Sequence, residues 1–306
     1  MIYPESFEAK IGFADIRARL ASMCLCPLGM ERVEQMTFMT DHKAVSEALA
    51  CVRHMCVLLE GDEEFPARDF FDMRQMLRAI RPHGTYMEVR QMWELGRSLQ
   101  AVINVVRFLK ETPLAHLTEN VETFPLIVRR TEQILDPFGQ VKDTASPALA
   151  DIRHQMAAAE GSVGRALRSI LRAAKEEGIA APDAEPAMRD GRLVIPVTPA
   201  MKRKLHGIVH DESATGKTVF IEPAEVVEAN NRIRELEAEE RREIIRILQA
   251  FSDEVRPLAS QMLQSYEFLA DVDFIYAKAR YAKAENAVAP QLNSYTLIDW
   301  TRAVHP

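Results

Sequence analysis

Residues 189–223 read Arg-Asp-Gly-Arg-Leu-Val-Ile-Pro-Val-Thr-Pro-Ala-Met-Lys-Arg-Lys-Leu-His-Gly-Ile-Val-His-Asp-Glu-Ser-Ala-Thr-Gly-Lys-Thr-Val-Phe-Ile-Glu-Pro, and in this stretch the sequence stops following a helical period. Three apolar alternations, at 193–197, 205–209 and 218–221, have the period of two that is typical of half-buried strands. Asp211–Gly216, between the last two, has the composition of a turn. We therefore predict a small antiparallel sheet over about 189–222.

Two long helical patterns flank this stretch, one at about 148–178 and the other at about 223–250. Both keep apolar residues at spacings of three and four, and the second has a densely charged outer face. Three short strands cannot bury both faces of a sheet by themselves, so other elements must support them. We predict an inserted clamp over 148–250, in which two long antiparallel helices carry the sheet as a tip.

The rest of the chain is predicted to be helical, which makes the fold mainly α. Residues 1–147 form the first part of a helical core and lever domain, and residues 251–300 return to it. Asn293–Asp299 has the alternation of a strand. The chain stops at Pro306 without a closing element, so we expect it to be a piece of a longer protein.

Composition excludes several classes of protein. The chain has 306 residues, 47% of them hydrophobic and 27% charged, with a net charge of −7, which is typical of a globular protein and not of a polycation. It has no apolar run of about 18 residues and no signal peptide at its start, so we expect a cytoplasmic protein without a membrane partner. The four cysteines, at 24, 26, 51 and 56, lack the usual zinc spacing and are expected to be reduced core thiols.

Residues 189–223 contain three partial matches to catalytic or metal-binding motifs, and the neighbouring residues argue against each of them. Thr215–Thr218 reads Thr-Gly-Lys-Thr, but a phosphate-binding P-loop needs glycine where Asp211 stands, and a helix in place of the strand that follows. His206 and His210 lie about 13 Å apart on an extended strand, too far for one metal ion. Ser213 has no neighbouring base. We therefore predict no catalytic residue, cofactor or metal site in this chain.

Charge asymmetry is the remaining signal. Between Arg153 and Lys217 the chain has eleven basic and eight acidic residues, a net charge of +3 within a chain of −7. Lysine and arginine clustered beside a projecting tip are typical of contact with a phosphate backbone. No aromatic residues accompany the cluster, so base stacking is not indicated. The candidate nucleic-acid-binding residues are Arg189, Arg192, Lys202, Arg203, Lys204 and Lys217.

Several segments of the sequence resemble the MutS family, and most closely its second type, the MutS-like proteins that suppress recombination. The resemblance covers essentially the whole chain. The segments that carry it are 3–13, 26–29, Gly191–Val197, 204–216, Thr218–Pro223, 230–235 and the terminal His305-Pro306.

This resemblance implies a core and lever domain with an inserted DNA clamp, followed by an ATPase domain that binds ATP and Mg²⁺ and begins near residues 301–306. The second type ends in an endonuclease-like Smr domain. Neither a P-loop nor an Smr motif occurs in this sequence. The resemblance also implies that the parent protein is a homodimer, and Phe220-Ile-Glu222 is interpreted as a chance match to the mismatch-reading motif.

Three functional hypotheses follow. The leading one is a non-catalytic lever and clamp that contacts the backbone of duplex or branched DNA without sequence specificity. The same clamp could instead grip rRNA on stalled ribosomes, a role also tied to the second type. The second hypothesis is a structural arm that mediates dimerisation, and the third is an enzyme acting through the Lys217 region.

Overall fold

The computed structural model describes residues 7–295 and 297–304, and within it the chain divides into two compact units. Unit 1 comprises residues 1–140 and 248–306, and unit 2 comprises residues 141–247. In the described part of the chain, no helix is both long and apolar enough to cross a membrane. The terminal His305-Pro306 lies outside the described residues.

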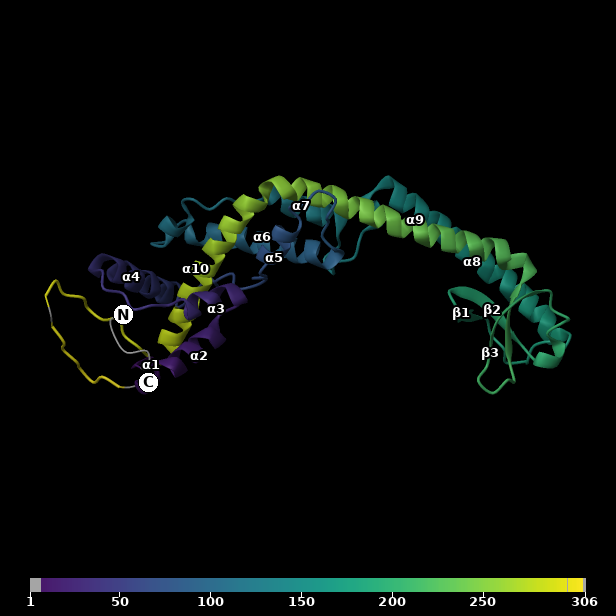
Figure 1. The fold of residues 1–306 in the computed structure, drawn as a ribbon, viewed down its shortest axis with the longest axis horizontal. Coiled ribbons are helices and arrows are strands. Elements are labelled where there is room, and N and C mark those ends of the chain that lie inside the picture. Colours follow the sequence, from purple (N-terminus) through teal and green to yellow (C-terminus); the bar gives the residue numbers. More distant parts are fainter. Residues whose placement is uncertain (1–6, 296, 305–306) are drawn as a thin grey trace. The chain divides into compact units, whose positions relative to one another are not determined.

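Unit 1 is helical (Figure 1). Its elements are α1 (Phe7–Lys10), α2 (Phe13–Met23), α3 (Pro27–Glu34), α4 (His42–Leu58), α5 (Arg74–Ala79), α6 (Val89–Leu109), η1 (Ala115–Thr118), α7 (Pro125–Ile134), η4 (Arg256–Leu258) and α10 (Ala259–Ala284), together with the end of α9 (Ala224–Val255). Pro27 opens α3. Proline suits the first position of a helix, because the backbone N–H that it lacks would have no partner within the helix and its fixed φ is close to the helical value.

The contact between α3 and α10 explains why glycine stands at position 29. The carboxylate of Asp273, fully buried on α10, accepts hydrogen bonds from the backbone N–H groups of Leu25 at 2.8 Å and Cys26 at 3.1 Å. A Cβ atom at Gly29 would lie 2.2 Å from Asp273 Oδ2. Asp273 therefore caps the start of α3 from a helix almost 250 positions away in the sequence, and the close approach requires glycine.

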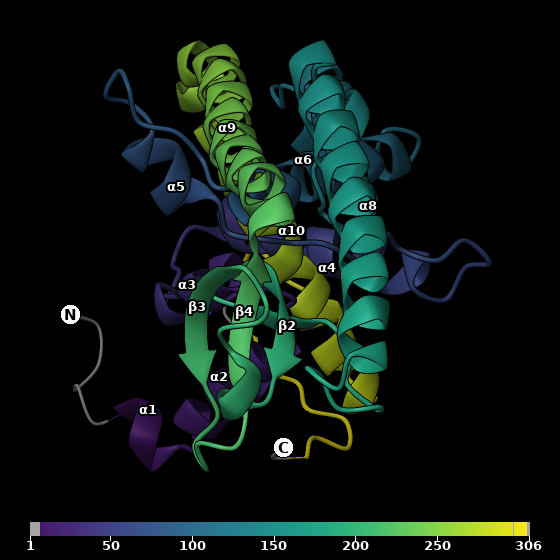
Figure 2. The same cartoon turned by 90° about the vertical axis from the view of Figure 1, so that its right-hand side faces the viewer.

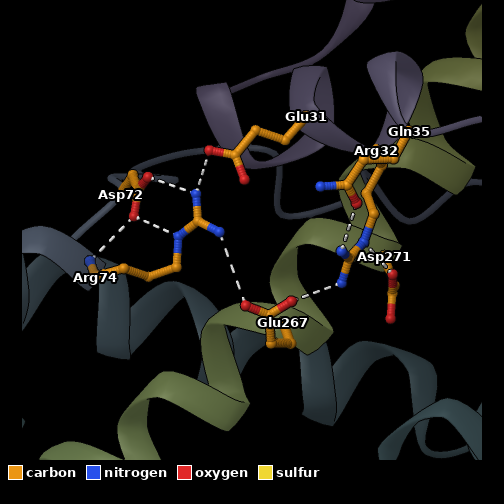
Figure 3. Close-up of polar contacts among 7 residues, drawn as sticks. All are labelled: Glu31, Arg32, Gln35, Asp72, Arg74, Glu267 and Asp271. Atoms are coloured by element: carbon orange, nitrogen blue, oxygen red, sulfur yellow. Dashed lines mark hydrogen bonds and ion pairs between the residues drawn. The ribbon is translucent and has the colours of Figure 1, made fainter.

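An ion-pair network on the surface of unit 1 joins the same two helices to the start of α5 (Figure 3). Arg74 pairs with Asp72 at 2.9 Å and with Glu31 of α3 at 2.6 Å. Arg32 of α3 pairs with Glu267 at 2.8 Å and with Asp271, one turn further along α10, at 2.7 Å. Each arginine thus pairs with more than one carboxylate, and the network connects α3, α10 and the start of α5.

Unit 2 consists of a helix pair and a small sheet. Its elements are η2 (Asp143–Ala145), α8 (Pro147–Glu176), β1 (Ala187–Arg189), β2 (Arg192–Val197), η3 (Pro199–Met201), β3 (Gly207–Glu212), β4 (Val219–Pro223) and α9 up to residue 247. The strands form an antiparallel four-stranded sheet in the order β1-β2-β4-β3. Figure 2 shows β4 between β2 and β3, and the sheet lies at the end of the helix pair where α8 ends and α9 begins.

The two long helices of unit 2 run antiparallel, as predicted. Ser146 Oγ donates to Glu243 at 2.5 Å, and seven residues further along α8, Arg153 Nε donates to Glu240 at 2.7 Å. Arg232 then reaches Gln155 at 3.0 Å. Nearer the sheet, one buried cluster combines residues of α8, the sheet and α9: Val163, Leu167, Leu171, Ile195, Val197, Val219, Ile221, Val226 and Ile233. The mainly α fold with a long helix pair and a small antiparallel sheet is confirmed.

Two details of the strand prediction are wrong. The sheet contains a strand, β1, that was not predicted. It pairs with β2 through a turn at Asp190 and Gly191, whose φ angles of 48° and 71° are those of a two-residue hairpin turn. Conversely, the described residues of 293–299 contain no strand. A strand needs a neighbouring backbone, and the described residues pair none with this segment.

Candidate nucleic-acid interface

A buried carboxylate lies at the centre of the polar contacts of the sheet. Glu222 on β4 is fully buried. It accepts hydrogen bonds from Arg192 Nη1 at 2.7 Å, from His210 Nε2 at 2.6 Å and from Asn230 Nδ2 at 2.8 Å. Arg192 also donates to Asn231 at 2.7 Å. The network therefore ties three strands of the sheet to the first turns of α9.

The balance of forces on Glu222 favours its charged form. Burial by itself raises the pKa of Glu222, but the hydrogen bonds from Asn230, His210 and Arg192 outweigh burial and hold its pKa below the usual value. Because a buried carboxylate is stable only when its lone pairs are satisfied, all three donors are needed. Phe220-Ile-Glu222, interpreted above as a chance match, thus contributes the central residue of a structural network.

Arg189, at the end of β1, is also engaged within the sheet. Its guanidinium lies 4.0 Å from the ring centroid of Phe220, and its Nε lies 3.1 Å from Asp211 Oδ2 on β3. Arg189 therefore crosses the face of β4 and screens an aromatic ring from solvent. For Arg189 and Arg192, contact with nucleic acid stays a prediction, while their contacts within the sheet are structural.

Lys202, Arg203 and Lys204 form an exposed turn in the connection between β2 and β3. On either side of the turn, Met201 and Leu205 pack against the buried cluster of unit 2, which fixes the turn to the sheet. Across the described residues, no carboxylate forms an ion pair with any of these three cations, and no hydrogen bond occupies their side chains. The turn thus presents three adjacent cations to solvent.

Lys217 lies in the turn between β3 and β4, as the sequence predicts. The turn is closed by the Ser213 N–H, which donates to Thr218 O at 2.8 Å, and by the Thr218 N–H, which donates to Ser213 Oγ at 3.1 Å. Gly216 has a φ of 65°. The segment is a hairpin turn between two strands and not the strand-to-helix loop of a P-loop.

The sheet does not gather all six candidate residues into one patch. Arg192 lies beside the hairpin turn at one end of the sheet, where it reaches Glu222, whereas Lys217 lies in the turn at the opposite end. Arg189 starts beside Arg192, but its guanidinium reaches Asp211 near the far end of β3. With about 3.4 Å per residue, the six residues of β3 separate these ends by roughly 20 Å. The described residues also bring together no group of three histidine, cysteine or acidic side chains that could hold a metal ion.

One basic surface of unit 2 was not included among the candidate residues. Arg165, Arg168 and Arg172 are exposed on one face of α8. Their spacing of three and four residues was visible in the sequence, but the sequence alone could not show that this face is uncovered.

Comparison with known proteins gives a consistent result, although no family model matches the chain. An endonuclease MutS2 of a Geobacillus species is 33% identical over 96% of this chain and 38% of its own length. The endonuclease MutS2 of Halalkalibacterium halodurans is 36% identical, over 91% of this chain and 36% of its own length. Both of these relatives are MutS2 proteins.

The predicted resemblance to the second type of the MutS family is thus confirmed. The chain spans a little over a third of the length of the MutS2 relatives that it matches. The activity in their name therefore belongs to proteins much longer than this chain. Segments 191–197, 204–216, 218–223 and 230–235, which carried the resemblance to MutS2, supply strands β2, β3 and β4 and the Glu222 network.

Proposed function

We propose that unit 2 is a clamp that contacts the sugar-phosphate backbone of duplex or branched DNA without reading its sequence. The observation that carries the proposal is the Lys202-Arg203-Lys204 turn, whose three exposed cations are free of carboxylate partners within the described residues. Other cations of the unit, such as Arg153, Arg189 and Arg192, are already paired. Free cations in an exposed turn suit phosphate, because each contact releases counterions from the nucleic acid.

We expect binding without sequence preference, because the described residues of the sheet offer no exposed aromatic ring on which a base could stack. Phe220 is the one aromatic residue of 187–223, and it is buried beneath Arg189. Stacking on bases needs exposed aromatic rings, and reading base edges needs side chains inserted into a groove. The turn therefore offers positioning contacts and no base-specific ones.

For the longer protein we propose a cytoplasmic homodimer that uses ATP and Mg²⁺ and restrains recombination between DNA strands. The proposal extends the resemblance to MutS2 and assigns no catalytic role to any residue of this chain. Lys217, the residue of the third hypothesis, lies in a hairpin turn, which supports a binding role over an enzymatic one.

The test is a titration of the 306-residue chain with a DNA duplex, a DNA four-way junction and an RNA duplex. Binding is measured by fluorescence anisotropy at several salt concentrations. Lys202→Ala/Arg203→Ala/Lys204→Ala should weaken binding at least tenfold at low salt and reduce the slope of log K against log [salt] by about 2.7. The matched control, Arg53→Ala/Arg107→Ala/Arg129→Ala, removes three exposed cations from unit 1 and should leave both quantities unchanged.

The outcomes separate the competing functions. Unchanged affinity of the turn variant would exclude this turn from the interface. Tighter binding to an RNA duplex than to DNA would favour the ribosomal partner. If the wild-type chain binds neither nucleic acid but sediments as a dimer, the structural arm is the correct function.

A further inference from the structure

The arginine stripe of α8, formed by Arg165, Arg168 and Arg172, has a charge pattern that is unfavourable for a free helix. Neighbours three and four residues apart lie side by side on a helix, so Arg165 faces Arg168, and Arg168 faces Arg172. Lys175 extends the series by another three residues. Residues 161–175 contain these four cations and no acidic residue. Each adjacent pair is therefore repulsive.

The charge pattern of α8 differs from that of α9, the other long helix of unit 2. On α9, Arg232 pairs with Glu235 at 3.2 Å and Arg246 pairs with Glu243 at 2.6 Å. On α8, none of the three stripe arginines has an ion pair or hydrogen bond to any described residue. A helix that only needs a solvated surface is stabilised by alternating charges, as α9 is, and the uncompensated stripe calls for another explanation.

The residues around the arginine stripe have small side chains that leave the guanidinium groups accessible. The guanidinium of Arg165 lies beside Gly161, and that of Arg168 lies beside Gly164, 3.5 and 3.6 Å from the positions that a Cβ atom would occupy. Exposed neighbours include the small residues Ser162, Ser169 and Ala173. The buried face of α8, with Leu167 and Leu171, lies on the other side of the helix. A polyanion can therefore approach all three guanidinium groups at once.

We infer that the arginine stripe is a second backbone-contact surface for a nucleic acid duplex, separate from the Lys202-Arg203-Lys204 turn. This inference rests on the proposed function and extends it from the sheet to the helix. Three guanidinium groups spaced over seven residues cover about 10 Å along the helix, enough to meet several phosphates of one strand. Bound phosphate replaces the missing carboxylates and removes the repulsion within the stripe.

The experiment compares Arg165→Gln/Arg168→Gln/Arg172→Gln with the wild-type chain, using a DNA duplex and an RNA duplex as separate probes. Glutamine keeps the helical propensity, so the variant should fold, with a melting temperature equal to or above that of the wild type because the repulsion is gone. Its affinity for duplex should fall at least tenfold at low salt, and its salt slope should fall by about 2.7. The matched control is Arg53→Gln/Arg107→Gln/Arg129→Gln.

The possible results distinguish the stripe from the turn. If the turn variant loses affinity and the stripe variant does not, the inference is wrong and the proposed function stands. If the stripe variant alone loses affinity, the stripe is the main contact and the turn is not. Failure of the wild-type chain to bind either duplex overturns both, and would favour an acidic protein surface as the partner of the stripe.

Discussion

Single residues in this protein matter most where a polar group is buried. Glu222 in unit 2 and Asp273 in unit 1 are both fully buried carboxylates, yet their environments act in opposite directions. Glu222 is surrounded by charged and amide donors, and its pKa is lowered. Burial raises the pKa of Asp273, and the hydrogen bonds that it accepts from Leu25, Cys26 and Gly29 do not outweigh this effect. The first carboxylate needs its charge, and the second tolerates losing it.

Glu222→Gln should therefore lower the free energy of unfolding of unit 2 by about 2 to 4 kcal/mol at neutral pH, since the partly buried Arg192 would lose the carboxylate that it pairs with. The folded pKa of Glu222 lies below its unfolded value. Its contribution is thus fully present above an unfolded pKa of about 4.3 and is lost as pH falls through the folded pKa. Urea denaturation of both proteins from pH 7 to pH 3 should show a difference that shrinks below about pH 4.3. A difference that grows on acidification would contradict this assignment.

At the scale of elements, glycine has opposite effects on stability in α8 and in the sheet. Gly164 lies inside a helix, where a Cβ atom would meet its nearest neighbour, Arg168, at 3.6 Å, an ordinary contact. Gly207 lies at the start of β3, where a Cβ atom would come within 2.1 Å of Glu222 O. The first glycine weakens its helix, and the second allows two strands to approach.

Gly164→Ala should raise the free energy of unfolding by about 0.5 to 1 kcal/mol, because alanine restricts the unfolded chain and favours the helix. Gly207→Ala is the matched control with the opposite sign, since the backbone of β4 must move to admit the methyl group. Thermal denaturation followed by circular dichroism at 222 nm measures both. Destabilisation by the alanine at position 164 would show that the middle of α8 needs its glycine.

The elements were predictable from sequence to the extent that their signals are local. Periodicity predicted the helices now seen as α8 and α9 to within a few residues, and alternation predicted β2, β3 and β4. The strand β1 was missed because three residues show no alternation, although the Asp190-Gly191 pair is a known hairpin signal. The role of Arg192 could not be predicted, because its partner Glu222 lies 30 positions away and is identified only by the register of the sheet.

At the scale of the whole molecule, the chain has at least two separate sets of buried residues. The core of unit 2 combines the sheet with α8 and the start of α9, whereas unit 1 is organised around α10 and its contacts with α3 and α4. Chains with two cores commonly unfold in more than one step. The variants that disturb one core should therefore leave the other intact.

Differential scanning calorimetry should resolve two transitions that respond to different substitutions. Glu222→Gln should lower the melting temperature of one transition, that of unit 2. Gly29→Ala, which would drive a methyl group into the carboxylate of Asp273, should lower the other. A single transition lowered equally by both variants would mean that the units unfold together.

The four native cysteines have a practical consequence for such experiments. Burial raises the pKa of Cys24 and Cys26 to about 12, and it also raises the pKa of Cys51 and Cys56. Since the thiolate is the reactive form, all four should alkylate slowly. A cysteine introduced at Ala214, in the exposed hairpin turn beside Lys217, should therefore accept a maleimide fluorophore selectively, and unit 2 can be labelled without removing any native thiol.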